Sequence, residues 1–374
     1  MCPAAPSAPR LVLGIGNGLQ AKEQRGYPSS VARSQMDLNK DPMPPPRIMD
    51  VALAAGVSPT TVSHALTGKR PVSAAAQAKV HAAVRELGYS GNVLARGLRT
   101  QRTLTIALVI PDITNPFYPV VARGVQDAVT NFGYQVVVCS TDGDEAREAS
   151  FIREMVARSV DGMILGLLHT PSAILESLVG RNLRIVMLGH HLGRELGDRV
   201  ISDNRVIVAE ATRHVVRMGR ARIAFVGGAA GVGPGDERQA GYQDALLGAG
   251  LALDPALVVA TGYTRASGTS AVQHLLDAGV DFDAVVAVND LAAIGAMHAL
   301  RASGRSVPDD VAVIGFDDID AAALVHPSLT TVDNRAYEKG ALCGRLLLER
   351  LSGELTGPFR EIVVPGTLVV RESG

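Results

Sequence analysis

Apolar segments alternate with amphipathic ones from residue 104 almost to the end of this 374-residue chain. Seven apolar segments are predicted as β-strands: 104–111, 134–139, 162–166, 184–188, 222–228, 284–288 and 311–315. Helices are predicted in the stretches 120–132, 145–159, 204–218, 238–249, 269–278, 292–303 and 335–352. Strands that are apolar along their whole length and are separated by helices are typical of parallel sheets covered on both faces. The chain is therefore predicted to have an α/β core.

The alternation starts anew around Ile201–Val206, which indicates two α/β units in series. Open parallel sheets bind ligands at the carboxyl ends of their strands, so a ligand site is expected in the cleft between the units. Asn115, Phe117 and Tyr118 follow the first strand at this end. Asn115 precedes a proline, however, and Asn-Pro is also ordinary turn chemistry.

Residues 50–66, DVALAAGVSPTTVSHAL, precede this core and are predicted to form two short helices around a turn at Gly56. Ser58 is suited to cap the second helix, and Pro59 is tolerated at its first position. The expected inward residues are Val51, Leu53, Ala54, Ala55, Val57, Val62 and Leu66. Four polar residues then face outward, where helix-turn-helix proteins read bases: Thr60, Thr61, Ser63 and His64. An ordinary helical hairpin is the alternative.

A third helix is predicted from a cap at Ser73 to Leu87, with Val80, Val84 and Leu87 on one face and Gly88 ending it. Residues 92–98 form at most a short helix, which is unstable without a partner that braces it.

Charge is distributed unevenly along the chain, although its formal net charge is only −1. Residues 43–102 hold eight Lys or Arg against Asp50 and Glu86, whereas residues 103–374 carry a net charge of −9. A basic segment on an acidic body is the electrostatic signature of a small nucleic-acid-binding domain.

Residues 1–46 are rich in proline, lack periodicity and are predicted to be disordered. Met43 is an alternative start that would place residues 1–42 outside the native protein. We find no signal peptide and no apolar run long enough to span a bilayer, and we expect a cytoplasmic protein. The separated Cys2, Cys139 and Cys343 fit a reducing compartment, with no disulfide framework, metal site or cofactor expected.

Five segments in collinear order resemble the lactose-repressor/galactose-repressor (LacI/GalR) family of bacterial transcriptional regulators. They are DVALAAGVSPTTVSHAL, VRELGYSGNVLARGLRT (84–100), LVIPDITNPFY (108–118), VAVNDLAAIGAM (286–297) and VAVIGFDDID (311–320). The resemblance implies an all-α helix-turn-helix headpiece and an α/β core of two doubly wound parallel-sheet subdomains, like the periplasmic sugar-binding proteins.

The implied domains are a DNA-binding headpiece at 47–90, a hinge helix and linker at 91–103, and an effector-binding core at 104–374. Within the core, about 104–202 and 335–362 would form the N-subdomain, and about 203–334 and 363–374 the C-subdomain.

In the headpiece, the resemblance implies that Thr60, Ser63 and His64 face the major groove, whereas Pro59 cannot donate a hydrogen bond to a base. Lys69, Arg70 and Arg99 are candidates for phosphate contacts, the alternative being solvated surface charges. Leu98 matches the hinge leucine that acts as a minor-groove wedge, and Ala95 would let paired hinges approach closely. Leu98 could instead pack on the core.

In the core, the resemblance implies that Arg238, Asn289 and Asp317 bind effector hydroxyls, with Asp203 and Asp290 as further candidates. Asp290 could instead cap the helix that follows it. Tyr263 would line the pocket. Because the chain has no tryptophan, Phe117, Tyr118 or Tyr263 would have to stack on a sugar ring. A sugar or sugar derivative is the favoured effector, and a purine or nucleoside is the alternative.

The chain ends shortly after Val370 without a leucine heptad, so a dimer on a two-half-site operator is expected rather than a tetramer. The favoured function is an effector-controlled repressor that binds double-stranded operator DNA. A solute-binding protein for transport is a second reading, disfavoured by the basic headpiece. An enzyme is a third, and we find no nucleophile elbow, GK[ST] phosphate loop or HExxH sequence to support it.

Overall fold

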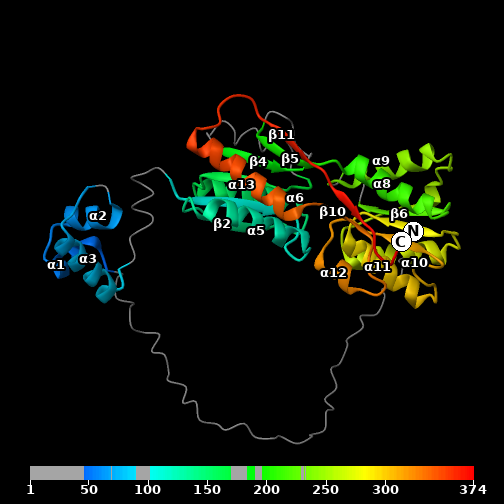
Figure 1. Ribbon diagram of the computed structural model, residues 1–374, viewed down its shortest axis with the longest axis horizontal. Helices are drawn as coiled ribbons and strands as arrows, with labels where there is room; N and C mark the ends of the chain where they lie inside the picture. The colour runs from blue at the N-terminus through cyan, green and yellow to red at the C-terminus, as the bar shows by residue number, and fades with distance from the viewer. Residues whose placement is uncertain are drawn as a thin grey trace, which may run out of the picture. The chain divides into compact units, whose positions relative to one another are not determined.

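The computed structural model describes residues 46–68, 70–89, 102–169, 183–189, 196–228, 231 and 233–374. The chain divides into two compact units, Met1–Ser90 and Gly91–Gly374 (Figure 1). The predicted disorder of residues 1–46 falls almost entirely outside the described residues. The predicted helix at 92–98 lies outside them altogether.

The described part of the first unit contains three helices, as predicted: α1 (Ile48–Ala55), α2 (Pro59–Thr67) and α3 (Ala74–Leu87). Gly56 ends α1 with φ 64°, the left-handed conformation that favours glycine. The Ser58 hydroxyl accepts a hydrogen bond of 3.1 Å from the Thr61 amide and so caps α2, with Pro59 as its first residue. Ser73 caps α3 in the same way. The turn and both caps were correctly predicted from the sequence.

The inward faces of the first two helices were partly mispredicted. Leu53 is 85% exposed, Ala54 is exposed, and Leu66 is 38% exposed. The core of this unit is built instead from small residues one, three or four positions apart, which a helix places on one side. They are Val51, Ala52, Ala55, Val62, Ala65, Val80 and Ala83. Alanines let three short helices approach closely, and this leaves the larger leucines outside.

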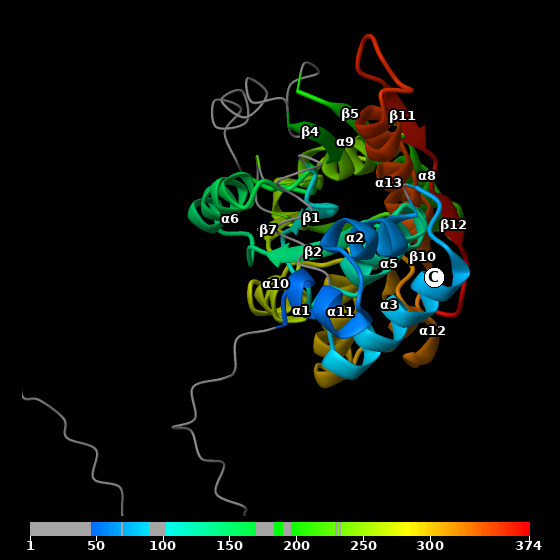
Figure 2. The same ribbon diagram turned by 90° about the vertical axis from the view of Figure 1, so that its left-hand side faces the viewer.

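The second unit begins with a parallel six-stranded sheet in the order β11-β5-β4-β3-β1-β2. Its strands are β1 (Thr105–Ile110), β2 (Gln135–Ser140), β3 (Gly162–Leu165), β4 (Arg184–Leu188), β5 (Asp198–Ser202) and β11 (Glu361–Val364). Helices α5 (Phe117–Thr130) and α13 (Ala336–Ser352) cover one face, and α6 (Glu145–Ala157) covers the other (Figure 2). Along β1, Ile106 and Leu108 face the first pair of helices, whereas Ala107 and Val109 face α6. The predicted double covering is confirmed.

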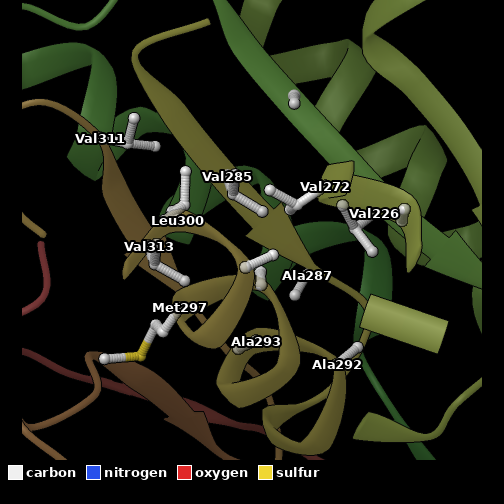
Figure 3. Close-up of a cluster of buried hydrophobic side chains, with 14 of the residues drawn as sticks. Val226, Val272, Val285, Ala287, Ala292, Ala293, Met297, Leu300, Val311 and Val313 are labelled. Atoms are coloured by element: carbon white, nitrogen blue, oxygen red, sulfur yellow. The ribbon is translucent and has the colours of Figure 1, made fainter. Parts of the chain in front are cut away.

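A second parallel sheet has four strands in the order β7-β6-β8-β9. The strands are β6 (Ile223–Gly228), β7 (Val258–Thr261), β8 (Ala284–Ala287) and β9 (Ala312–Ile314). Helices α8 (Asn204–Arg217) and α9 (Gly235–Gly248) cover one face. Helices α10 (Arg265–Asp277) and α11 (Asp290–Ala302) cover the other, where Val285, Val313 and Leu300 pack together (Figure 3).

The remaining elements are short and were not predicted. They are the 3-10 helix η1 (Pro255–Leu257), helix α12 (Asp320–Leu324) and the antiparallel pair β10 (Thr331–Asp333) and β12 (Thr367–Val369). Strands β5, β7 and β11 were also missed. The chain passes between the two sheets three times: from β5 to α8, from β10 to α13, and from β11 to β12. No helix in the described part of the chain is long and apolar enough to cross a membrane.

Candidate functional site

A cavity of about 470 Å³ lies in the second unit, where the carboxyl ends of strands from both parallel sheets meet. This is the place that the strand pattern predicts. Seven of the nine residues considered as effector candidates line it: Asn115, Phe117, Tyr118, Arg238, Tyr263, Asn289 and Asp317. Asp203 does not, and lies in a neighbouring surface hollow beside Arg205 and Glu237. Asn204, one residue later and at the start of α8, faces the cavity.

Arg238 is a buried cation of the cavity, held by a ring and two hydrogen bonds. Its side chain is 5% exposed and lies over the ring of Phe316, with the guanidinium carbon 3.6 Å from the ring centre. The Nε donates a hydrogen bond of 3.0 Å to Asn204 Oδ1, and an Nη donates to the Val288 carbonyl. These neutral acceptors fix the plane of the guanidinium and leave one edge toward the cavity. Burial lowers the pKa of Arg238, and nearby Asp317 opposes that shift.

Asp317 supplies a buried carboxylate in an unusual backbone conformation. Its φ is +118°, a region that favours glycine, and strained residues of this kind cluster at functional sites. One carboxylate oxygen accepts a hydrogen bond of 2.9 Å from the Asn334 side-chain amide. Burial raises the pKa of Asp317, while Arg238 and the bond from Asn334 lower it. The second oxygen has no hydrogen-bond partner among the described residues and can accept one from a ligand hydroxyl.

The roles of Asn289 and Asp290 at the start of α11 differ from the prediction. Asn289, not Asp290, caps α11: its Oδ1 accepts a hydrogen bond of 2.9 Å from the Ala292 amide, and its Nδ2 donates to the Tyr263 carbonyl. Asp290 is fully buried and accepts hydrogen bonds from Ile319 N and the Thr331 hydroxyl. Asp290 is therefore a structural residue beneath the cavity, and the expectation that it caps the helix was wrong.

Three aromatic side chains form part of the apolar cavity wall, together with aliphatic side chains such as Leu167 and Leu188. The rings of Phe117 and Tyr118 lie edge to face, 5.2 Å apart, at the start of α5. Tyr263 comes from the loop after β7. Burial raises the pKa of both tyrosines, so their hydroxyls stay protonated and can donate. Polar side chains surrounded by aromatic rings suit a ligand with apolar faces and many hydroxyls.

Sequence reasoning missed a hydrogen-bonded group at the floor of the cavity, formed by Ser202, Asn334 and Lys339. Lys339 is 1% exposed, and its Nζ donates to Ser202 Oγ and to Asn334 Oδ1. A signal was present in α13, because Lys339 precedes Cys343 by four residues and Leu347 by eight. A lysine in register with an apolar stripe is predicted to be buried.

The first unit presents its predicted contact residues on or beside α2. Thr60 and Arg70 are exposed, and Ser63 and His64 are half-buried. The Thr61 hydroxyl lies 2.9 Å from the Ser58 hydroxyl and is thus committed in part to the helix cap. The Nδ1 of His64 is covered and has no partner within the described residues. Lys69, Ala95, Leu98 and Arg99 lie outside the described residues.

No group of three or more His, Cys, Asp or Glu is arranged to hold a metal ion in the described ranges.

Comparison with known proteins matches both units. Residues 47–92 match the family "Bacterial regulatory proteins, lacI family", and residues 212–374 match the "Periplasmic binding protein-like domain". The chain is 38% identical to the HTH-type transcriptional regulator CelR of Thermobifida fusca, over 88% of this chain and 98% of that protein. It is 36% identical to the ribose operon repressor of Escherichia coli K12, over 81% of this chain and 92% of that protein.

The solved structure of a CelR–cellobiose complex is also similar, with a TM-score of 0.68 and 35% sequence identity. The superposition covers 88% of the present chain and 100% of the CelR chain. The helix-turn-helix unit, the two parallel sheets and these matches agree: the chain belongs to the lacI family of bacterial regulatory proteins, and it is a DNA-binding transcriptional regulator, not an enzyme.

Proposed function

We propose that this protein is a dimeric, cytoplasmic repressor whose operator affinity is controlled by a sugar or sugar derivative bound in the cavity. The observation that carries the effector class is that Arg238 and Asp317 line the same cavity as three aromatic rings. A sugar hydroxyl both accepts and donates hydrogen bonds, so it satisfies a guanidinium and a carboxylate at once. The relative CelR was solved in complex with cellobiose, which supports this class of ligand.

We propose that different residues within 47–90 and the linker 91–103 contact the bases, the phosphates and the minor groove of the operator. Thr60, Thr61, Ser63 and His64 would read base edges from α2, and Lys69, Arg70 and Arg99 would bind phosphates. Leu98 would enter the minor groove at the operator centre, where Ala95 would allow two hinges to meet. Two copies of the headpiece suit two half-sites, which supports a dimer.

Effector binding can change the arrangement of the two subdomains through the hydrogen bonds at the floor of the cavity. Asn334 donates to Asp317, and Ser202 Oγ donates to Asn334 Oδ1 at 3.0 Å. Ser202 and Asn334 lie on two of the three segments that join the sheets. A ligand that binds Asp317 therefore acts on the segments about which the subdomains would close, and it shifts the population toward the state that it binds better.

A thermal-shift screen against sugars, sugar phosphates and nucleobases tests the proposal, because a ligand raises the melting temperature by mass action. Asp317→Asn keeps the shape and tolerates positive φ, and it should abolish the ligand-induced shift while DNA binding is kept. Asp281→Asn, an exposed position, is the matched control. A nucleobase as the active ligand, or a wild-type shift in Asp317→Asn, would contradict the sugar assignment.

A further inference from the structure

Three charged side chains at the deep end of the cavity have no ion-pair partner within the described residues. Arg238, Lys339 and Asp317 are 5%, 1% and 9% exposed. Buried charges are ordinarily paired because their desolvation is costly. By contrast, the buried Arg350 lies 2.7 Å from Asp198. The stabilisation of these three charges therefore depends on the molecule that occupies the cavity.

The other carboxylates that line the cavity already accept hydrogen bonds from the protein. Asp112 accepts from Thr114, and Asp142 pairs with Arg147. Asp236 accepts from the Gly231 amide, and Glu237 from the Asn204 side chain. These four carboxylates are also exposed or half-buried, so water solvates and screens their charges. The buried charges of the lining are therefore two cations, Arg238 and Lys339, and one carboxylate, Asp317.

Lys339 distinguishes this cavity from one built for a neutral sugar. Arg238 and Asp317 are enough to satisfy sugar hydroxyls, so a neutral ligand leaves the Lys339 charge uncompensated. Two of the three ammonium protons go to Ser202 and Asn334, which are neutral acceptors. The third remains for a ligand. The ammonium also lies 6.0 Å from the centre of the Phe117 ring, on the wall where a sugar ring would stack.

We propose that the effector is a polyhydroxylated anion, a sugar acid or sugar phosphate, whose anionic group binds between Lys339 and Arg238 while its hydroxyls bind Asp317. The inference rests on the proposed function, since it names the chemical class of the ligand at the same site. The cavity volume of about 470 Å³ accommodates a ligand of this size. A charge-assisted hydrogen bond to a buried cation stabilises a complex by about 1.5–3 kcal/mol, or about 10–100-fold in affinity.

Isothermal titration calorimetry with matched pairs tests this: glucuronate against glucose, galacturonate against galactose, and glucose 6-phosphate against glucose. At least one anion should bind about 10–100-fold more tightly than its neutral counterpart. Lys339→Met keeps the length of the side chain and removes its charge, so it should abolish that preference by weakening binding of the anion more than binding of its neutral counterpart. Lys339→Arg should restore the preference. Lys79→Met removes an exposed lysine from α3 and is the control.

The outcomes separate the two proposals. If neutral sugars bind as tightly as their anions, or if Lys339→Met weakens both alike, the anion assignment is wrong and the sugar-responsive function stands. If no sugar of either kind binds, both fail. If Lys339→Met does not fold, the wild-type preference alone decides.

Discussion

Lys339 gives effector binding a pH dependence that can be measured. Burial, together with the positive charge of Arg238, lowers the pKa of the Lys339 amine to about 7, while Asp317, Cys343 and Asp333 oppose this shift. A bound anion stabilises the ammonium and raises its pKa in the complex, so binding takes up a proton above that pH. Affinity for an anionic sugar should therefore fall as the pH rises through about 7, by up to about tenfold per pH unit.

Calorimetry between about pH 6 and about pH 8.5 measures this slope. Lys339→Arg is the control, since arginine stays protonated over the whole range. Asp290 has a pKa raised to about 7 by burial and by Asp317, but it titrates in both proteins and cancels in the comparison. Equal slopes in wild type and Lys339→Arg would show that Lys339 does not hold the anion.

At the level of single residues, the sequence motifs predicted most of the residues that line the cavity. They did not predict which of two adjacent polar residues faces it. Asn289 and Asp290 are adjacent polar residues, and only the start of α11 decides that Asn289 caps the helix while Asp290 is buried. In the same way, Asn204 rather than Asp203 faces the cavity at the start of α8. A shift of one residue at a helix start turns a side chain by about 100°. A sequence motif does not fix that rotation.

At the scale of elements, β5 is tied to α13 by the buried pair Asp198–Arg350. Two hydrogen bonds of 2.7 and 2.8 Å join the carboxylate and the guanidinium, and the Arg360 amide adds a third of 2.7 Å. Asp198→Asn should lower the free energy of unfolding by about 3–5 kcal/mol, because it leaves the Arg350 charge buried without its partner. Glu154→Gln breaks the exposed pair with Arg158 and should cost at most about 1 kcal/mol. Urea unfolding measures both.

The same contact predicts a pH effect. Burial raises the pKa of Asp198, but the hydrogen bonds from Arg350 and Arg360 outweigh it, so that the pKa lies below its ordinary value. The stabilisation is present above the ordinary pKa of about 4 and is lost as the pH falls through the lower folded value. The stability difference between wild type and Asp198→Asn should therefore shrink toward about pH 2. A constant difference would exclude the ionised pair as its cause.

This pair also explains which strands could be predicted. β3 and β6 are apolar throughout and were recognised, whereas β5 begins with Asp198 and Arg199. Their charges are compensated by Arg350 and Glu361, more than 150 residues away in the sequence. Local patterning cannot anticipate such partners, so this interior strand of the sheet was not predicted.

In the whole molecule, the helix-turn-helix and the cavity belong to separate compact units, so a change that affects DNA contacts alone should leave effector binding intact. Leu98→Ala removes the proposed minor-groove wedge, so operator affinity should fall while the effector-induced thermal shift is unchanged. A wedge lets bent DNA contact more protein surface, and its loss also removes the distortion that it stabilises. Asp317→Asn should show the reverse: the DNA affinity is kept and the effector response is lost.

Fluorescence anisotropy with a duplex selected from a random pool measures the operator affinity of each variant with and without effector. The thermal shift measures effector binding in the absence of DNA. Leu94→Ala removes a leucine from the same segment and is the matched control, since it lies outside the residues proposed to touch DNA. If Leu98→Ala and Leu94→Ala weaken DNA binding equally, the segment acts through its packing and not as a wedge. If Leu98→Ala also weakens effector binding, then Leu98 belongs to the core, because a side chain inserted only into DNA has no means of changing affinity in the absence of DNA.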